Sequence, residues 1–258
     1  MSIDDAEIAR VDAAIERALA TGDTGELRIL GYGEVSCVVA SETAAGRFAV
    51  KRLPPFADEG RLARYEATLK RSIERLETRG IRGARSELRS VPRGRGGIVA
   101  YCVQPMLDPG TLGPRHFAAA GPDAAAASFS LLFDHMMCAI DAGTGLDGQI
   151  SNWALDGGAA VYLDVTTPRL RDAEGREELD VDLFLASLPA PLRPVVKRFM
   201  LRSILDKYYE RRGVVLDLLG NLIKEKLEHL LPRFLGIANA RLEQPITVSK
   251  RAWDQRKL

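Results

Sequence analysis

Cysteine and histidine are both scarce in this sequence, with three of each among 258 residues. The cysteines, Cys37, Cys102 and Cys138, are far apart and lie in apolar runs. Such an odd, widely spaced set excludes a disulfide framework and predicts small buried side chains in a reducing compartment. The histidines form no i,i+4 pair, so a zinc site is not expected.

Long apolar runs are missing as well. No stretch of about eighteen uncharged apolar residues occurs, which is the length that a membrane-spanning helix needs. The N-terminal segment carries acidic residues at once and has no basic stretch before an apolar core, so we expect no signal peptide. Because the net charge is only +1, neither nucleic acid nor a membrane is expected as a partner. We expect a cytoplasmic protein.

The apolar patterns predict a small β-rich part followed by a larger helical part. Residues 1–25 are expected to form an amphipathic helix, whose apolar stripe is Ile8, Val11, Ile15 and Leu19. Over residues 26–107, the apolar pattern predicts strands at 27–30, 36–41 and 47–52, a helix over 62–80, and a strand pair over 86–107. Residues 108–258 are expected to be mainly helical, interrupted by a hairpin with strands at 153–155 and 159–163. We therefore predict an α+β fold with two lobes that meet near residues 104–108.

Two basic stretches offer other interpretations. Residues 79–97 hold six arginines, which suggests a nucleic-acid surface, but few aromatic residues lie among them and the whole chain is nearly neutral. Residues 193–212 are basic and amphipathic, a pattern that also suits a membrane or a partner protein. Solvent-exposed loop arginines and an ordinary surface helix are the simpler interpretations of these two stretches.

A polar loop lies just before the predicted hairpin. Asp147 and Asn152 share this loop, and Asp164 follows the second strand of the hairpin. The chain has only three asparagines, so an aspartate followed five residues later by an asparagine has few opportunities to occur by chance. A carboxylate and an amide oxygen, together with phosphate oxygens, suit a hard cation such as Mg²⁺. An ionised Asp147 only accepts hydrogen bonds and would orient or deprotonate a substrate hydroxyl.

The β-rich part has its own candidate residues. Gly31, Gly33 and Ser36 form a small-residue turn that allows the backbone to approach a ligand closely. Lys51 lies in the strand sequence FAVK, and Glu66 lies on the predicted helix close to its apolar side, from where it would hold Lys51. Taken singly, each feature is more often structural, and Glu66 then pairs with Lys70 on the helix surface. Glu74 is the fallback partner for Lys51.

The order and spacing of these residues resemble the protein-kinase-like fold, in particular its aminoglycoside phosphotransferase and choline-kinase-like branch. The resemblance extends over roughly residues 27–168, and the C-terminal helices are compatible with it. It implies a β-rich nucleotide-binding lobe at 26–107 and a helical lobe at 108–258 that carries the catalytic loop and the metal site. It also implies ATP and Mg²⁺ as cofactors and phosphoryl transfer to a hydroxyl or amine of a small molecule.

The roles that the resemblance implies transfer by position. Lys51 would contact the α- and β-phosphates and pair with Glu66, and the turn with Gly31, Gly33 and Ser36 would cover the phosphates. Asn152 and Asp164 would hold Mg²⁺, and Asp147 would accept the proton of the attacking group. The backbone of residues 104–107, including Gln104 and Met106, would face adenine.

The sequence also departs from the family pattern. Gly145 stands where a histidine is common, Ser36 replaces the third glycine, and DVT replaces DFG at Asp164. Gln149 stands where many protein kinases have a lysine, which argues against a typical protein kinase. Two alternatives therefore stay open: a catalytically degenerate nucleotide-binding scaffold, and an unrelated α+β interaction protein. The acceptor, the choice between ATP and GTP and the oligomeric state are not indicated by the sequence.

Overall fold

The first helix begins at a capping aspartate and packs its apolar stripe against a sheet. The computed structural model describes residues 3–32, 37–185 and 201–247. Helix α1 (Asp5–Thr21) starts after Asp4, whose side chain accepts a hydrogen bond from the Glu7 amide at 2.8 Å, and ends at Gly22 with φ of 77°. The stripe is buried at Ile8, Val11 and Ile15. Leu19 is 66% exposed and is not part of the stripe, because it lies in the last turn of α1.

A five-stranded antiparallel sheet forms the β-rich part. Its strand order is β1 (Ile29–Tyr32), β2 (Cys37–Thr43), β3 (Gly46–Arg52), β6 (Ile98–Pro105) and β5 (Glu87–Pro92). The predicted strands are confirmed where they lie within the described residues, with ends shifted by one or two residues for most of them.

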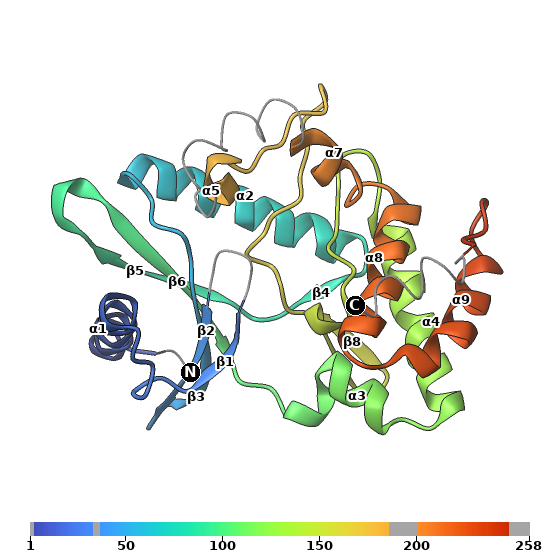
Figure 1. Ribbon diagram of the computed structural model, residues 1–258. Coiled ribbons are helices and arrows are strands. Elements are labelled where there is room, and N and C mark those ends of the chain that lie inside the picture. The colour runs from blue at the N-terminus through green and yellow to red at the C-terminus, as the bar shows by residue number, and fades with distance from the viewer. Residues whose placement is uncertain (1–2, 33–36, 186–200, 248–258) are drawn as a thin grey trace.

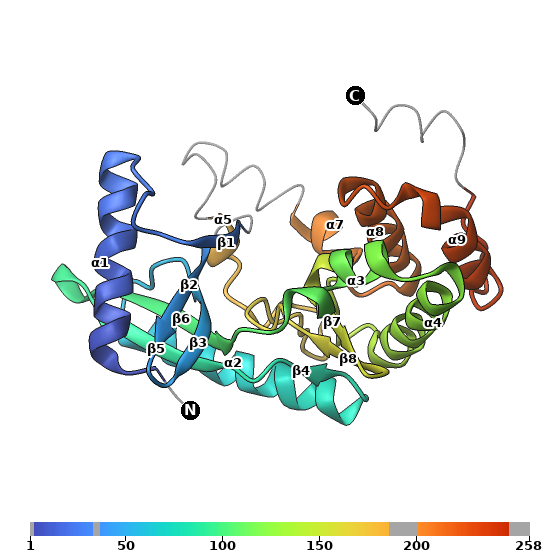
Figure 2. The same ribbon diagram turned by 90° about the horizontal axis from the view of Figure 1, so that it is seen from below.

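The two faces of this sheet are covered by different helices. Successive side chains of a strand point to opposite faces, and β6 is apolar on both. Its residues Val99, Tyr101 and Val103 pack in the core shared with α1, whereas Ile98 and Ala100 pack in the core shared with α2 (Glu59–Thr78). Figure 2 shows α1 and α2 on either side of the sheet. The β-rich part is therefore a layered unit with a buried central strand.

The helical part is built around a small second sheet. Its elements are α3 (Gly113–Ala119), α4 (Pro122–Ala139), β7 (Trp153–Asp156), β8 (Ala159–Tyr162), α5 (Asp182–Leu185), α7 (Leu201–Asp206), α8 (Arg211–Lys224) and α9 (Leu231–Asn239). Short 3-10 turns are found at Gly94–Gly96, Pro109–Thr111, Ile150–Asn152 (η3) and Glu228–Leu230. The first part of the basic amphipathic stretch at 193–212, up to residue 200, lies outside the described residues.

One strand of the second sheet comes from the first half of the chain. β4 (Arg82–Gly83), which directly follows α2, pairs in parallel with β8, while β8 pairs with β7 as the predicted hairpin. β4 lies in the sequence before the predicted boundary near residue 107, yet it belongs to the sheet of the helical part. The chain therefore enters the helical part once before that boundary. A strand of two residues carries too little apolar periodicity to be recognised in the sequence.

The predicted α+β class is confirmed. Figure 1 shows the five-stranded sheet with α1 on one side of the molecule and α3, α4, α8 and α9 on the other, with α2 running along both. Over the described ranges, no helix combines the length and the apolar character that crossing a membrane requires.

Candidate functional site

Two predicted site residues from opposite ends of the pattern form an ion pair. The Lys51 ammonium on β3 donates to Asp164 Oδ1 at 2.7 Å, and both side chains are mostly buried, at 24% and 18% exposed. Asp164 follows β8, so this contact joins the five-stranded sheet to the second sheet. Lys51 is fixed within β3, and Asp164 lies two residues after the end of β8, so the sheets hold the two charges close together.

Hydroxyl groups add to the contacts of Asp164. Thr166 and Thr167 donate to its Oδ1 at 3.1 and 3.4 Å, so the three contacts gather on one oxygen. Burial of this carboxyl acts to raise its pKa, but the Lys51 ammonium and the hydrogen bonds outweigh burial and lower the pKa. Asp164 is thus held ionised, and its Oδ2 receives no hydrogen bond from any described residue.

Asp147 has a different environment in the polar loop before η3. Its Oδ1 accepts from the Gln149 amide at 3.1 Å, and its Oδ2 accepts from the Gln149 side chain at 3.4 Å. Burial raises the pKa of Asp147 above its usual value, and the negative charge of Asp164 adds to this effect. Asp147 and Asp164 are therefore close enough to influence each other, and their pKa values move in opposite directions.

Asn152 lies at the end of η3 and connects the loop to the segment after β8. Its side-chain amide is 3.5 Å from the Asp147 carbonyl oxygen, and its own carbonyl accepts from the Leu163 amide at 2.8 Å. Asn221 on α8 supports the same loop, since its side chain accepts from the Ser151 amide at 3.3 Å. The Asn152 Oδ1 is left without a hydrogen bond to the described residues.

Gly145 is surrounded by atoms that leave no room for a side chain. A Cβ at this position would lie 2.9 Å from the Tyr208 carbonyl oxygen and 3.0 Å from the Arg169 Cβ. The Gly145 amide donates to the Arg169 carbonyl at 2.9 Å, and the Leu146 amide donates to the Tyr208 carbonyl at the same distance. The buried Arg169 guanidinium stacks 4.0 Å from the centre of the Tyr208 ring. Packing of Arg169 and Tyr208 thus explains why no histidine stands at 145.

The predicted contact between Glu66 and Lys51 is not formed. Glu66 is exposed on α2, as is the fallback candidate Glu74, whose carboxylate lies 3.9 Å from Lys70. The buried face of α2 carries neutral groups instead, namely Tyr65, Thr68 and Ser72. The expectation was wrong because the buried stripe of α2 contains Tyr65, the residue before Glu66, and not Glu66 itself. Its side chain therefore points to solvent.

The predicted adenine-facing segment is partly committed to other contacts. The Met106 amide donates to the Arg47 carbonyl at 2.9 Å, so its N–H extends the pairing of β6 with β3 and is not free for a base. Gln104 contributes its side chain, which donates to Ser86 Oγ and to the Leu163 carbonyl, both at 3.0 Å. Gly31 lies in β1, whereas Gly33 and Ser36 lie outside the described residues.

The donor set at the site fits a hard cation. Among the residues that the structure describes, no group of three histidine, cysteine, aspartate or glutamate side chains is placed to hold a metal. Mg²⁺ does not need such a group, because it keeps several waters and is usually bound by one or two carboxylates plus substrate phosphates. The uncommitted Asp164 Oδ2 and Asn152 Oδ1 are oxygen donors of this kind.

Several residues that contribute to the site were not singled out from the sequence. The structure brings Thr166, Thr167, Arg169, Asn221 and Tyr65 to it, the last through a hydrogen bond of its hydroxyl to the Thr166 carbonyl at 2.8 Å. Thr166 and Thr167 were within reach of sequence reasoning, since they lie two and three residues after Asp164. Arg169, Asn221 and Tyr65 carried no local signal, because each reaches the site through tertiary packing.

Comparison with known sequences places the chain in a family. No curated protein matches it. A family model does match, over residues 10–257, which include every described residue of the candidate site. The chain belongs to this family, DUF6206, a family of unknown function.

Proposed function

We propose that the protein is a kinase-like phosphotransferase that uses ATP and Mg²⁺ to phosphorylate a hydroxyl or amine of a small molecule. The observation that carries the proposal is the 2.7 Å contact of Lys51 with Asp164, next to the loop with Asp147 and Asn152. A strand lysine, a loop aspartate, an asparagine and a second aspartate in this order are the groups that kinase-type phosphoryl transfer uses.

The arrangement of the elements supports the same proposal. The β-rich part is an antiparallel sheet with α2 inserted after β3, and a single segment near residues 104–108 leads from β6 into the helical part. We propose that these parts are the two lobes of a kinase-like fold, with the site between β3 and the segment after β8. Fold alone does not imply function, so the weight rests on the site residues.

The residues have complementary tasks in this proposal. Lys51 would bind phosphate oxygens, and Asp147 would orient the acceptor and take its proton, a task helped by a pKa raised above the usual value of 3.8. Asn152 and Asp164 would hold Mg²⁺, which neutralises charge on the phosphate oxygens when bound. Catalysis of this type is mainly positioning and electrostatic stabilisation.

A second candidate function is a nucleotide-binding scaffold without turnover. The observation in its favour is that no carboxylate of α2 pairs with Lys51, which leaves Asp164 as the partner of the lysine. In that arrangement the lysine and the aspartate neutralise each other, and a nucleotide with Mg²⁺ has to separate them. Nucleotide binding is common to both candidates, whereas phosphoryl transfer belongs to the first alone.

The experiment is a thermal-shift titration with ATP, with and without Mg²⁺. A ligand that binds only the native state raises its apparent stability, by about 2.7 kcal/mol at a concentration of 100 Kd. We expect Mg²⁺-dependent stabilisation of the wild type that is lost in Asp164→Ala and kept in Asp156→Ala, an exposed aspartate at the end of β7. Absence of any shift at millimolar ATP would refute both candidates. Stabilisation without ADP formation in an acceptor screen would leave the scaffold.

A further inference from the structure

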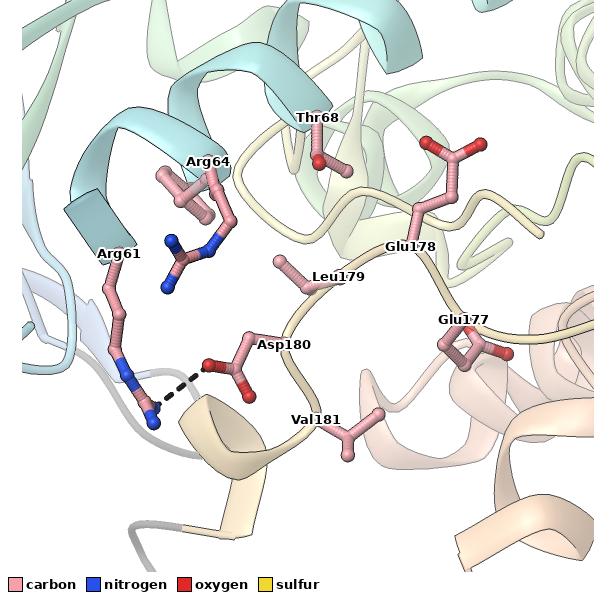
Figure 3. A pocket seen from close by; sticks show the side chains of 9 residues that line it. Arg61, Arg64, Thr68, Glu177, Glu178, Leu179, Asp180 and Val181 are labelled. Carbon is pink, nitrogen blue, oxygen red and sulfur yellow. Dashed lines mark hydrogen bonds and ion pairs between the residues drawn. The ribbon is translucent and has the colours of Figure 1, made fainter. Parts of the chain in front are cut away.

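We propose that the pocket between α2 and residues 177–181 binds a small organic anion, a phosphate ester or carboxylate with an apolar body. The pocket has a volume of about 430 Å³, within the range of small-molecule sites. One wall is formed by Arg61, Arg64, Tyr65 and Thr68 of α2, and the other by the five residues 177–181. Figure 3 shows these two walls facing each other. The proposal does not depend on the phosphotransferase assignment.

The carboxylates that line the pocket already have partners. Asp180 is 3.0 Å from Arg61, and Glu178 is 2.6 Å from Arg71. Glu177 binds Arg171 at 2.8 Å, an arginine that it shares with Asp206, and also accepts from the Tyr209 hydroxyl at 2.6 Å. An incoming cation would have to displace one of these partners. The acidic residues therefore do not make the pocket a cation site.

Arg64 is the charged lining residue that is left over. It forms no hydrogen bond or ion pair with any described residue, although Arg61, one turn earlier on the same helix, is paired. Figure 3 shows its guanidinium between the side chains of Arg61 and Leu179. A guanidinium matches the two oxygens of a carboxylate or phosphate in a bidentate contact. The uncommitted charge of the pocket is thus positive.

The remaining lining favours an apolar body on the ligand. Leu179 is buried at 4% exposure, Val181 is partly buried, and the buried Tyr65 lines the α2 side. The Tyr65 hydroxyl is committed, because it donates to the Thr166 carbonyl, whereas Thr68 accepts from Arg71 at 3.2 Å and keeps its O–H as a donor for an anion. An inorganic anion alone would leave the apolar lining in contact with water, so an organic anion is the better fit.

The pocket is connected to the candidate site through Tyr65. Tyr65 lines the pocket, its hydroxyl donates to the Thr166 carbonyl at 2.8 Å, and the Thr166 hydroxyl donates to Asp164. A ligand that shifts α2 against residues 177–181 therefore acts on the residues that hold Asp164. Coupling of the anion to Mg²⁺ or nucleotide through this route rests on the proposed function, whereas the anion site itself does not.

The test uses isothermal titration with phenyl phosphate, benzoate and inorganic phosphate as probes, and with the neutral benzamide as a control. We expect both aromatic anions to bind the wild type, inorganic phosphate to bind more weakly, and benzamide not to bind. Loss of a charge-assisted contact in Arg64→Ala should weaken binding by about tenfold or more. The matched control is Arg75→Ala, an exposed arginine on α2 that does not line the pocket. The stronger of the two anions identifies the preferred head group.

The proposal would be overturned by the absence of binding of either aromatic anion at millimolar concentration, or by equal affinity in the wild type and Arg64→Ala. A second variant, Lys51→Met, separates this site from the candidate nucleotide site. Anion affinity that drops in Lys51→Met and not in Arg64→Ala would place the probe at Lys51 and also refute the proposal. Because ATP with Mg²⁺ is titrated separately, failure of nucleotide binding is distinguishable from failure of the anion site.

Discussion

The two aspartates of the candidate site differ in how firmly the protein holds them. Asp164, after β8, forms a 2.7 Å ion pair with Lys51 and further contacts with two threonines, and its pKa is lowered. Asp147, in the loop before η3, has contacts of 3.1 and 3.4 Å with Gln149, and its pKa is raised by burial and by Asp164. One carboxylate is fixed and ionised, and the other is loosely bound and easier to protonate.

The opposite pKa shifts indicate how the two carboxylates would divide the work of the proposed site. Carboxylates whose environments push their pKa values apart are the usual basis for different roles in one site. A firmly ionised carboxylate suits a charge-binding task, whereas a carboxylate with a raised pKa and few contacts suits proton transfer. The protein therefore contains the asymmetry that the proposed function needs before any ligand arrives.

Neutralising the loosely held aspartate, Asp147, is expected to have the largest effect. Asp147→Asn keeps the shape of the side chain but cannot accept a proton, so phosphoryl transfer should fall by about 10²–10⁴-fold. Nucleotide affinity should stay close to that of the wild type, since Asp147 is not expected to bind the cofactor. Steady-state transfer rates and nucleotide titrations on the same preparations measure both quantities.

The control for this prediction is Asp156→Asn in the exposed end of β7, which should change neither quantity. Equal turnover in the wild type and Asp147→Asn would remove Asp147 from the role of base. A loss of nucleotide affinity in Asp147→Asn, as large as that in Asp164→Ala, would show that the two aspartates share one task.

A second prediction disturbs the loop that holds Asp147 without touching its carboxylate. Gly145→Ala would place a Cβ 2.9 Å from the Tyr208 carbonyl oxygen, where the backbone on both sides is hydrogen-bonded. We expect a loss of about 1–3 kcal/mol in the free energy of unfolding, the usual cost of overpacking. Gly143→Ala is the matched control, because its Cβ would meet nothing closer than 3.6 Å. Urea unfolding curves compare the two variants. Equal midpoints would contradict the prediction and show that the atoms around Gly145 move to accommodate a Cβ.

The third and smallest expected effect is a change in stability with pH. The folded-state pKa of Asp164 lies below 3.8, so its ionised form stabilises the fold above that pH, and this contribution is lost as the pH falls through the folded pKa. For Asp147 the folded pKa lies above 3.8, so its contribution to stability declines as the pH rises from 3.8 through the folded pKa. The effect is about 1.4 kcal/mol for each unit by which a pKa is shifted.

Unfolding free energies of the wild type, Asp147→Asn and Asp164→Asn over the acidic range measure these contributions. Relative to Asp164→Asn, the wild type should gain stability with rising pH, and relative to Asp147→Asn it should lose stability. Difference curves with the same sign would show that the two carboxylates are not held in opposite ways.

Much of the fold could be predicted because its elements carry strong local patterns. Helix α2 repeats apolar residues at helical spacing, strand β6 is a short continuous apolar run, and the glycines between β7 and β8 mark a hairpin turn. The strand β4 was missed, since a segment of two residues gains its order from its partner β8 and not from its own sequence. Local pattern thus predicted the elements, while long-range pairing decided how the two parts join.

The site residues that could be predicted are those whose position depends on nearby sequence, whereas contacts that depend on tertiary packing could not be predicted. Asp147, Asn152 and Asp164 lie on two short segments next to the hairpin, and the structure brings them to one region with Lys51. Glu66 failed as the partner of Lys51 because the facing of a helical side chain changes by about 100° per residue. In the sequence, Glu66 lies near the edge of the apolar stripe. In the folded protein Tyr65 is buried and Glu66 is exposed.

The pairing of β4 with β8 also governs the order in which the chain gains structure during synthesis. β4 leaves the ribosome about 80 residues before its partner, and contacts of such large sequence separation form late in folding. Until β8 is made, the backbone groups of β4 and the end of α2 next to it have no sheet to join. A fragment that stops after β6 contains all five strands of the large sheet, yet it lacks the strand against which β4 is ordered. The two parts are interlocked, and neither can be excised from the other along a single cut.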